Sequence, residues 1–173
     1  MDIVLHQPKA NLGHKDIFVA VPLGEAKENC IFHLGKAMDQ NARKAVQSAN
    51  SKNIATIAKA VDEKNLRFLL DKSEVKYIYG LEAIHHKDHL HYRKGALDQV
   101  TCKLAKEKGI TFVVSMAELL TAKNKAQFLG RVIANAKLCK KYKVPMLMVT
   151  FANSDLMMRS AADMKSFMKI LGL

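Results

Sequence analysis

Four histidines lie within a stretch of seven residues: His85, His86, His89 and His91. Imidazole nitrogens are common ligands for zinc and similar ions, so one hypothesis is a metal-dependent phosphoesterase. A metal centre needs several ligands in one place, yet Glu82 is the single carboxylate nearby that follows an apolar run. The other histidines, His6, His14 and His33, are isolated in the sequence. We therefore favour a polar loop that contacts a partner molecule, with no metal or other cofactor bound by the protein itself.

A second pattern lies in the helix predicted over residues 124–142. Arg131, Asn135, Leu138 and Tyr142 follow one another at spacings of four, three and four, which places them in one line along a helix. The apolar face of this helix is a different set: Phe128, Leu129, Val132, Ile133, Ala136 and Cys139. The line is therefore expected to meet something polar and charged. Its sequence does not separate contact with RNA from contact with a neighbouring protein.

Other catalytic signatures do not occur in the sequence. It has no glycine-rich phosphate loop, no nucleophile elbow and no arrangement of paired carboxylates. Asp88, Asp98 and Asp155 are better interpreted as helix caps or as partners of lysine and arginine. We expect no catalytic residue in this chain.

Charge points to a polyanionic partner. The net charge is +12 and the isoelectric point is about 9.7, which is typical of a nucleic-acid-binding protein. Aromatic residues are few and tryptophan is absent, which favours phosphate contact with structured RNA over base stacking. The second half of the chain is rich in basic residues: Lys87, Arg93, Lys94, Lys103, Lys106, Lys123, Lys125, Arg131, Lys137, Lys140, Lys141 and Arg159.

Length and composition predict one globular domain, residues 1–173, in the cytoplasm. A chain of 173 residues with 49% hydrophobic content can bury a substantial core. We find no apolar run long enough for a membrane span and no signal peptide. Cys30, Cys102 and Cys139 are an odd number without metal-type spacing, so they are expected to be buried, reduced thiols.

The elements that must position these residues alternate between strand and helix. Apolar and β-branched runs predict strands at residues 3–6, 17–21, 30–34, 75–79, 111–116 and 146–151, whereas the pattern of residues 54–59 fits a strand and a helix equally. Helices are predicted at residues 41–51, 97–108 and 124–142, with two more that begin after the caps Asp62 and Ser160. Continuous apolar strands that alternate with helices indicate a parallel sheet covered on both faces. The links at residues 8–14 and 23–29 are too short for complete crossover helices.

Three segments resemble the protein component 3 family of archaeal and eukaryotic ribonuclease P. The first carries Arg131, Asn135, Leu138, Cys139, Lys141, Tyr142, Val144, Pro145 and Met146. The second carries Ala152, Asn153, Met158, Arg159, Ser160, Asp163, Phe167, Leu171 and Gly172. The third, upstream, runs from Lys87 to Arg93 and continues with Gly95, Ala96, Leu97, Asp98, Gln99 and Val100. The resemblance extends from about Asp62 to the end, and this chain departs from it with Asp98 in place of Asn and Ala161 in place of Pro.

The resemblance implies an α/β fold, a TIM-barrel-like parallel barrel, here trimmed to about seven strands with surrounding helices, and it makes residues 54–59 one of the strands. It implies a protein subunit of ribonuclease P, the endoribonuclease that removes the 5′ leader of precursor tRNA. Catalysis would then belong to the RNA and its bound Mg²⁺. Implied partners are the ribonuclease P RNA, precursor tRNA, protein component 2 and other subunits, without a membrane.

The residues implied to bind RNA come from these matched positions and from the basic helices. They are Lys87, His91, Arg93, Lys94, Gln99, Lys103, Arg131, Asn135, Lys137, Lys140, Lys141 and Arg159. Leu138 and Tyr142 are the expected interface with component 2. Two other hypotheses stay open. One is a phosphoesterase of the polymerase-and-histidinol-phosphatase barrel type, and the other is a basic assembly protein without direct RNA contact.

Overall fold

Seven parallel strands form one sheet in this computed structural model, which describes residues 1–173 except 22–29, 35–39, 86, 89–90 and 92–94. The strands are paired in the order of the sequence. They are β1 (Asp2–Val4), β2 (Ile17–Val21), β3 (Cys30–Leu34), β4 (Thr56–Lys59), β5 (Tyr77–Tyr79), β6 (Thr111–Ser115) and β7 (Met146–Val149). Because the strands are parallel, the chain must return to the same end of the sheet before each new strand begins, and helices form most of these connections.

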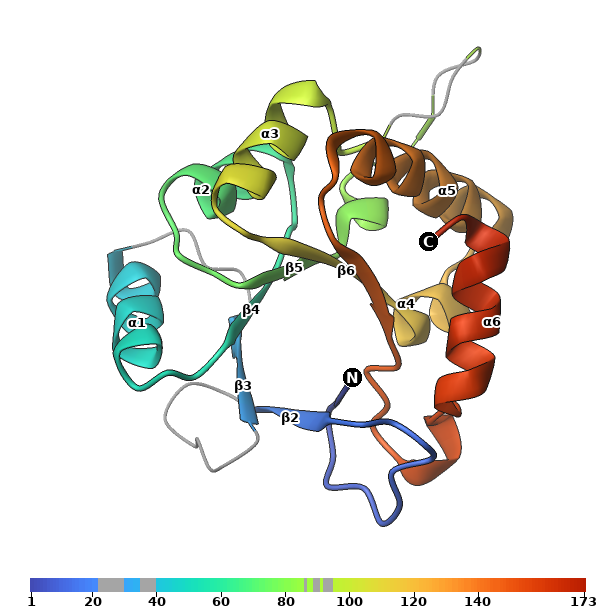
Figure 1. The fold of residues 1–173 in the computed structure, drawn as a ribbon. Helices are drawn as coiled ribbons and strands as arrows, with labels where there is room; N and C mark the ends of the chain where they lie inside the picture. The colour runs from blue at the N-terminus through green and yellow to red at the C-terminus, as the bar shows by residue number, and fades with distance from the viewer. Residues whose placement is uncertain (22–29, 35–39, 86, 89–90, 92–94) are drawn as a thin grey trace.

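Helices cover the outside of the curved sheet (Figure 1). They are α1 (Gln40–Ser51), α2 (Glu63–Asp71), α3 (Gln99–Glu107), α4 (Met116–Thr121), α5 (Lys125–Tyr142) and α6 (Ala161–Leu171). Two short 3₁₀ helices, η1 (Leu81–Ala83) and η2 (Asp155–Met157), follow β5 and β7. Because the strands are parallel, their carboxyl ends share one end of the molecule. The helix ends and the turns into the next strand lie at the opposite, amino end.

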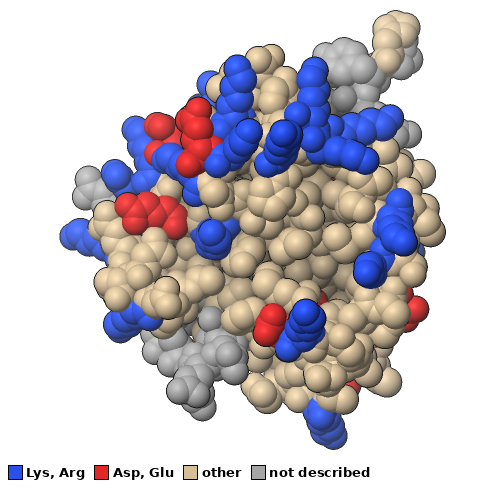
Figure 2. Space-filling model, viewed as in Figure 1, with Lys and Arg blue, Asp and Glu red and all other residues tan. Residues whose placement is uncertain are grey.

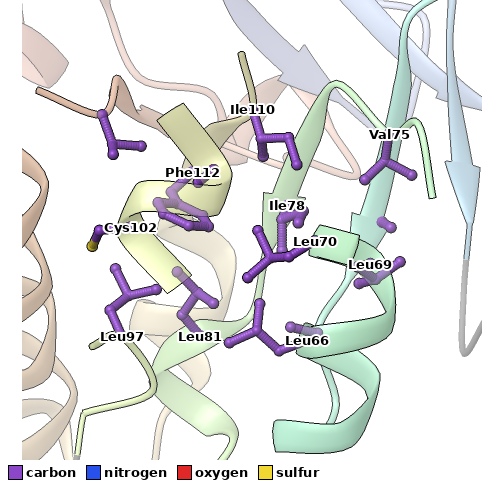
Figure 3. Packing of buried hydrophobic residues seen from close by; sticks show 14 of the residues in the cluster. Leu66, Leu69, Leu70, Val75, Ile78, Leu81, Leu97, Cys102, Ile110 and Phe112 are labelled. Atoms are coloured by element: carbon purple, nitrogen blue, oxygen red, sulfur yellow. The ribbon is translucent and has the colours of Figure 1, made fainter. Parts of the chain in front are cut away.

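Alternation along the strands separates an inner from an outer core. The inner cluster takes one residue from each strand: Ile3, Ala20, Ile31, Ile57, Tyr79, Val113 and Val149. The strand neighbours Ile78 and Phe112 point the other way and pack against the helices. Figure 3 shows this outer layer, in which Ile78 and Phe112 meet Leu66, Leu69 and Leu70 of α2 and Cys102 of α3. All seven strands therefore contribute to one apolar cluster on the inner side of the sheet.

The first and last strands are joined beyond the end of β7. Phe151 N donates to Ile3 O at 2.9 Å, and Leu5 N donates to Ala152 O at 2.7 Å. The fully buried carboxylate of Asp2 accepts from Thr150 N and from Thr150 Oγ1, both at 2.7 Å. These bonds hold the two outer strands of the sheet side by side.

Most predicted elements are confirmed. The seven parallel strands and the caps Asp62 and Ser160 are present, and no helix lies between β1 and β2. The link at residues 23–29 lies outside the described residues. Helix α4 was not predicted. The strand that was predicted to reach Met116 ends at Ser115, and the side chain of Ser115 caps this short helix. Cys102 and Cys139 are free and buried as expected, while the side chain of Cys30 lies outside the description.

Candidate nucleic-acid interface

Helices α3 and α5 pack against each other and expose a row of lysines (Figure 2). We call the exposed Lys103, Lys106, Lys137, Lys140 and Lys141 the lysine face. These side chains point outward because the same helices bury Cys102, Ala105, Val132, Ala136 and Cys139 toward the sheet. The sequence of α5 contains no acidic residue, and Glu107 is the only one in α3. The face therefore carries an almost uncompensated positive charge.

Arg131 is not part of this exposed face. It is 4% exposed, and its guanidinium binds the connection between β5 and α3. Nε and Nη2 donate to Oδ1 of Asp88 at 3.0 and 2.7 Å. Nη1 donates to the main-chain oxygens of Glu82 and His85 at 2.7 and 2.5 Å. The guanidinium of Arg131, which was expected to bind phosphate, thus binds groups of the chain itself.

Asn135, one turn further along α5, is 1% exposed and lies in the same buried network. Its Nδ2 donates to Oε1 of Glu82 at 3.2 Å. Among the described residues, neither Glu82 Oε2 nor Asn135 Oδ1 has a hydrogen-bond partner. Burial raises the pKa of Glu82 to about 7, an effect that the hydrogen bond from Asn135 partly offsets. Glu82 consequently changes its charge near neutral pH.

The line from Arg131 to Tyr142 therefore faces the interior between α5, η1 and α3. Leu138 and Tyr142 are half-buried against the outer core, so only their edges are available to a partner protein. One such edge lies beside Lys141, whose Nζ is 5.6 Å from the Tyr142 ring centre. The polar groups that the line meets are Glu82 and Asp88. Both residues stand out in the sequence, but no sequence pattern pairs either of them with the helix.

Other expected RNA-binding residues lie apart from the lysine face. Lys87, His91 and Gln99 are exposed at the carboxyl end, near the start of α3. Arg159 is exposed just before α6, where Nη1 donates to the main-chain oxygens of Met158 and Leu156 at 2.9 and 3.3 Å. The expected residues Arg93 and Lys94 lie outside the described residues. The structure thus groups Lys103, Lys137, Lys140 and Lys141 and separates Arg159 from them.

Histidines do not gather around a common point in the part of the chain that is described. No group of three or more His, Cys, Asp or Glu side chains is placed there to hold a metal ion. His85 pairs with Glu63, Nε2 to Oε1, at 3.3 Å. His6 Nε2 lies 2.8 Å from Asp155 Oδ1, and this hydrogen bond raises the pKa of His6. His86 and His89 lie outside the described residues.

Polar side chains outside the predicted RNA-binding set lie at the carboxyl ends of three consecutive strands. His33 Nε2 is 2.5 Å from Tyr79 Oη, and Lys59 Nζ is 2.5 Å from Glu118 Oε1. Burial and then the nearby Lys59 lower the pKa of His33, whereas burial and then Glu118 raise that of Tyr79. Lys59 is also 5.6 Å from the Tyr79 ring centre. Among the described residues Glu118 Oε2 has no hydrogen-bond partner, but the Lys59–Glu118 pair adds no net charge to this end.

Both departures from the family pattern have a local structural role. Asp98 is the N-cap of α3: its Oδ1 accepts from Thr101 N at 2.7 Å, and Thr101 Oγ1 accepts from Asp98 N at 2.8 Å. The hydrogen bond from the Thr101 backbone lowers the pKa of Asp98. Ala161 N donates to Leu12 O at 3.1 Å, a bond that proline at this position could not make.

No protein-family model and no curated protein matches the chain. Its fold is similar to one chain in the cryo-EM structure of archaeal ribonuclease P with mature tRNA. The TM-score is 0.80 at 15% identity, over 98% of this chain and 81% of that chain. The predicted likeness to ribonuclease P is thus confirmed for the fold.

Two other solved structures share the fold more distantly. Ochratoxinase of A. niger gives a TM-score of 0.55 at 14% identity, over 99% of this chain and 43% of that chain. A zinc-bound amidohydrolase from Burkholderia ambifaria gives a TM-score of 0.50 at 16% identity, over 88% of this chain and 37% of that chain.

In the described part of the chain, no helix is both long and apolar enough to span a bilayer.

Proposed function

We propose that this chain is an RNA-binding protein subunit of ribonuclease P. The observation that carries the proposal is the lysine face, which has five ammonium groups on two packed helices. These two helices contain a single acidic residue, Glu107 of α3. It is supported by the similarity of nearly the whole chain to a chain of archaeal ribonuclease P. Structured RNA is the partner whose phosphates match such a surface.

The mechanism is electrostatic and organisational. Lysines neutralise phosphates and release condensed counterions, which stabilises a compact RNA fold. The RNA and its Mg²⁺ carry out hydrolysis of precursor tRNA, and the protein alone has no turnover. Protein component 2 is the proposed neighbour at the edges of Leu138 and Tyr142. We place the subunit in the cytoplasm, in keeping with its buried free thiols Cys102 and Cys139.

The proposal is tested by reconstitution. The chain, component 2 and the ribonuclease P RNA of the same organism are combined with precursor tRNA, and 5′ cleavage is measured at modest Mg²⁺. We expect the proteins to stimulate cleavage by the RNA and to produce none without it. Cleavage by the protein alone in the presence of zinc or manganese would instead favour the phosphoesterase hypothesis.

The contribution of the lysine face is tested by the triple variant Lys137→Ala/Lys140→Ala/Lys141→Ala. Each phosphate contact adds about 0.9 to the slope of log affinity against log salt, so three lost contacts should lower the slope by roughly 2 to 3. Affinity for the RNA is measured by filter binding between about 0.05 and 0.2 M salt. Lys9→Ala/Lys123→Ala/Lys165→Ala, at exposed positions elsewhere, is the control. An equal loss in both variants would mean that total charge matters and the lysine face does not.

A further inference from the structure

Turns that lead from a helix into the next strand form the amino end of the sheet, and each of the four that are described carries lysine. The lysines are Lys52 after α1, Lys72 and Lys76 after α2, Lys108 after α3, and Lys143 after α5. All five are exposed, and Glu74 is the only acidic residue in these turns. The amino end is therefore strongly basic.

The carboxyl end has no such excess. Its described connections, short helices included, carry Lys9, Lys15, Lys87, Lys123 and Arg159 beside seven acidic residues: Asp16, Asp62, Glu82, Asp88, Asp98, Glu118 and Asp155. Arg93 and Lys94, which lie outside the described residues, bring the basic and acidic groups of these connections to equal numbers. Charge is thus distributed unequally between the two ends of the sheet, and the amino end is the one that attracts polyanions.

A groove of about 710 Å³ runs across the amino ends of β4 and β5. Its polar lining includes Asn50, Asn53, Glu74, Lys76, Tyr77 and Lys108. Asn50 Nδ2 donates to Glu74 O at 3.1 Å and to Glu74 Oε2 at 3.3 Å, which fixes one wall. Lys108 Nζ donates to Asp71 O at the opposite side. The groove is thus formed by residues that hold one another in place.

The chemistry of this lining fits a nucleotide. Lys76 and Lys108 supply ammonium groups for a phosphate, while the Asn53 amide and Glu74 carboxylate offer a donor and acceptors for a base edge. The half-buried Tyr77 ring adds an apolar surface. A volume of this size accepts a single extruded nucleotide, whereas an RNA double helix is far too wide to enter it.

The groove and the lysine face are also close together along the chain. Lys108 follows α3 directly, and Lys106 of the lysine face lies two residues before it. We propose that RNA bound on the lysine face continues onto the amino end of the sheet, where this groove takes one unpaired nucleotide. The inference rests on the proposed function and adds a second contact region to it.

Lysines near a helix end have another possible use, because they also complement the helix dipole. Two measurements separate the two roles. Affinity and its salt slope report phosphate contacts, whereas the melting temperature reports a contribution to the helices. Both are measured for Lys76→Ala/Lys108→Ala and for the matched exposed pair Lys9→Ala/Lys123→Ala.

The probe is the ribonuclease P RNA of the same organism, in normal form and with 4-thiouridine for crosslinking. We expect the groove variant to bind roughly tenfold more weakly at 0.15 M salt, with a slope smaller by about 1.5. The control pair should bind as the unmodified protein does, and both melting temperatures should be unchanged. Crosslinked peptides should contain residues 73–77.

Three outcomes would decide against the inference. If the groove variant binds normally while Lys137→Ala/Lys140→Ala/Lys141→Ala binds weakly, the second contact region is wrong and the proposed function stands. If the groove variant only melts earlier, its lysines serve the helix ends. If the unmodified protein does not bind the RNA, the proposed function fails and the inference with it.

Discussion

The carboxyl group of Glu82 is buried away from solvent, and its folded-state pKa of about 7 lies above the ordinary value of 4.5. The folded protein therefore binds more protons than the unfolded chain between these two values, so its stability falls as pH rises through this window. Above pH 7 the folded protein bears the full cost of the buried charge, which lowers the free energy of unfolding by roughly 3 kcal/mol. Glu82→Gln cannot ionise and should remove most of this fall.

Urea unfolding between pH 4.5 and 8.5 measures the effect. The variant should be the more stable protein at pH 8.5, and the difference should shrink toward pH 4.5. Glu107→Gln, at an exposed position of α3, is the control and should follow the unmodified protein. Parallel profiles for Glu82→Gln and the unmodified protein would show that Glu82 is already neutral, or solvated, across the range.

The buried Arg131 forms a charge pair with the partly buried Asp88 and also binds two main-chain oxygens. Removing one member of such a pair leaves the other uncompensated, which costs about 3–5 kcal/mol. Arg131→Ala should lower the free energy of unfolding by this amount, whereas the exposed Lys137→Ala should change it by less than about 0.5 kcal/mol. Denaturant melts of the two variants make the comparison. Similar small losses in both would contradict the placement of Arg131.

At the scale of one element, the start of α3 depends on Asp98. Its capping box with Thr101 satisfies backbone groups that the helix itself leaves unpaired. Asp98→Ala should cost about 1 kcal/mol, and Asp98→Asn, which restores the family residue, should cost much less. Because its pKa is lowered in the folded state, Asp98 stabilises above its unfolded pKa, and this contribution disappears as pH falls. Thermal melts at pH 7 and pH 3 test both points.

Elements with strong local signals could be predicted from the sequence, and weak ones could not. Asp62 and Ser160 precede clear apolar periodicity, so their helices were found. Helix α4 is only six residues long and follows the strand β6 without a break, so its first residue, Met116, was predicted as part of that strand and its other residues were assigned to no element. A short helix of this kind is stabilised by tertiary packing, here of Met116 and Leu119, which periodicity over so few residues does not reveal.

The candidate interface was predictable in part for a related reason. Lysines at 103, 137, 140 and 141 point outward because their helices bury the opposite side, and spacing alone indicates this. Arg131 and Asn135 also lie on a polar line of α5, but helical spacing does not show what stands opposite. A carboxylate after one strand, Glu82, and one in a loop, Asp88, take these positions. Such a pairing across 43 or more residues requires the fold.

For the whole molecule, Asp2 joins the first strand to the last. Its buried carboxylate accepts from Ile3 N at 2.8 Å and from two donors of Thr150. Asp2→Ala leaves these donors without a partner and should lower the free energy of unfolding by roughly 3 kcal/mol. Asp16→Ala, at an exposed position, should have little effect.

Hydrogen exchange locates the damage. In Asp2→Ala the amides of Leu5 and Phe151, which bond across the two outer strands, should lose protection first. Amides of the central strands β4 and β5 should exchange more slowly than these. Uniform loss of protection over the sheet would show that the outer strands do not open separately from the rest.

The Asp2–Thr150 contact spans 148 residues, so Asp2 is synthesised well before its partner. A nascent chain can pair β1 with β2 early, but the other edge of β1 must wait until Ala152 has left the ribosome. Closing so long a loop costs conformational entropy before any bond repays it, which slows folding. The exposed edge of β1 is meanwhile open to wrong partners, and a chaperone that covers it would act before the last helix is complete.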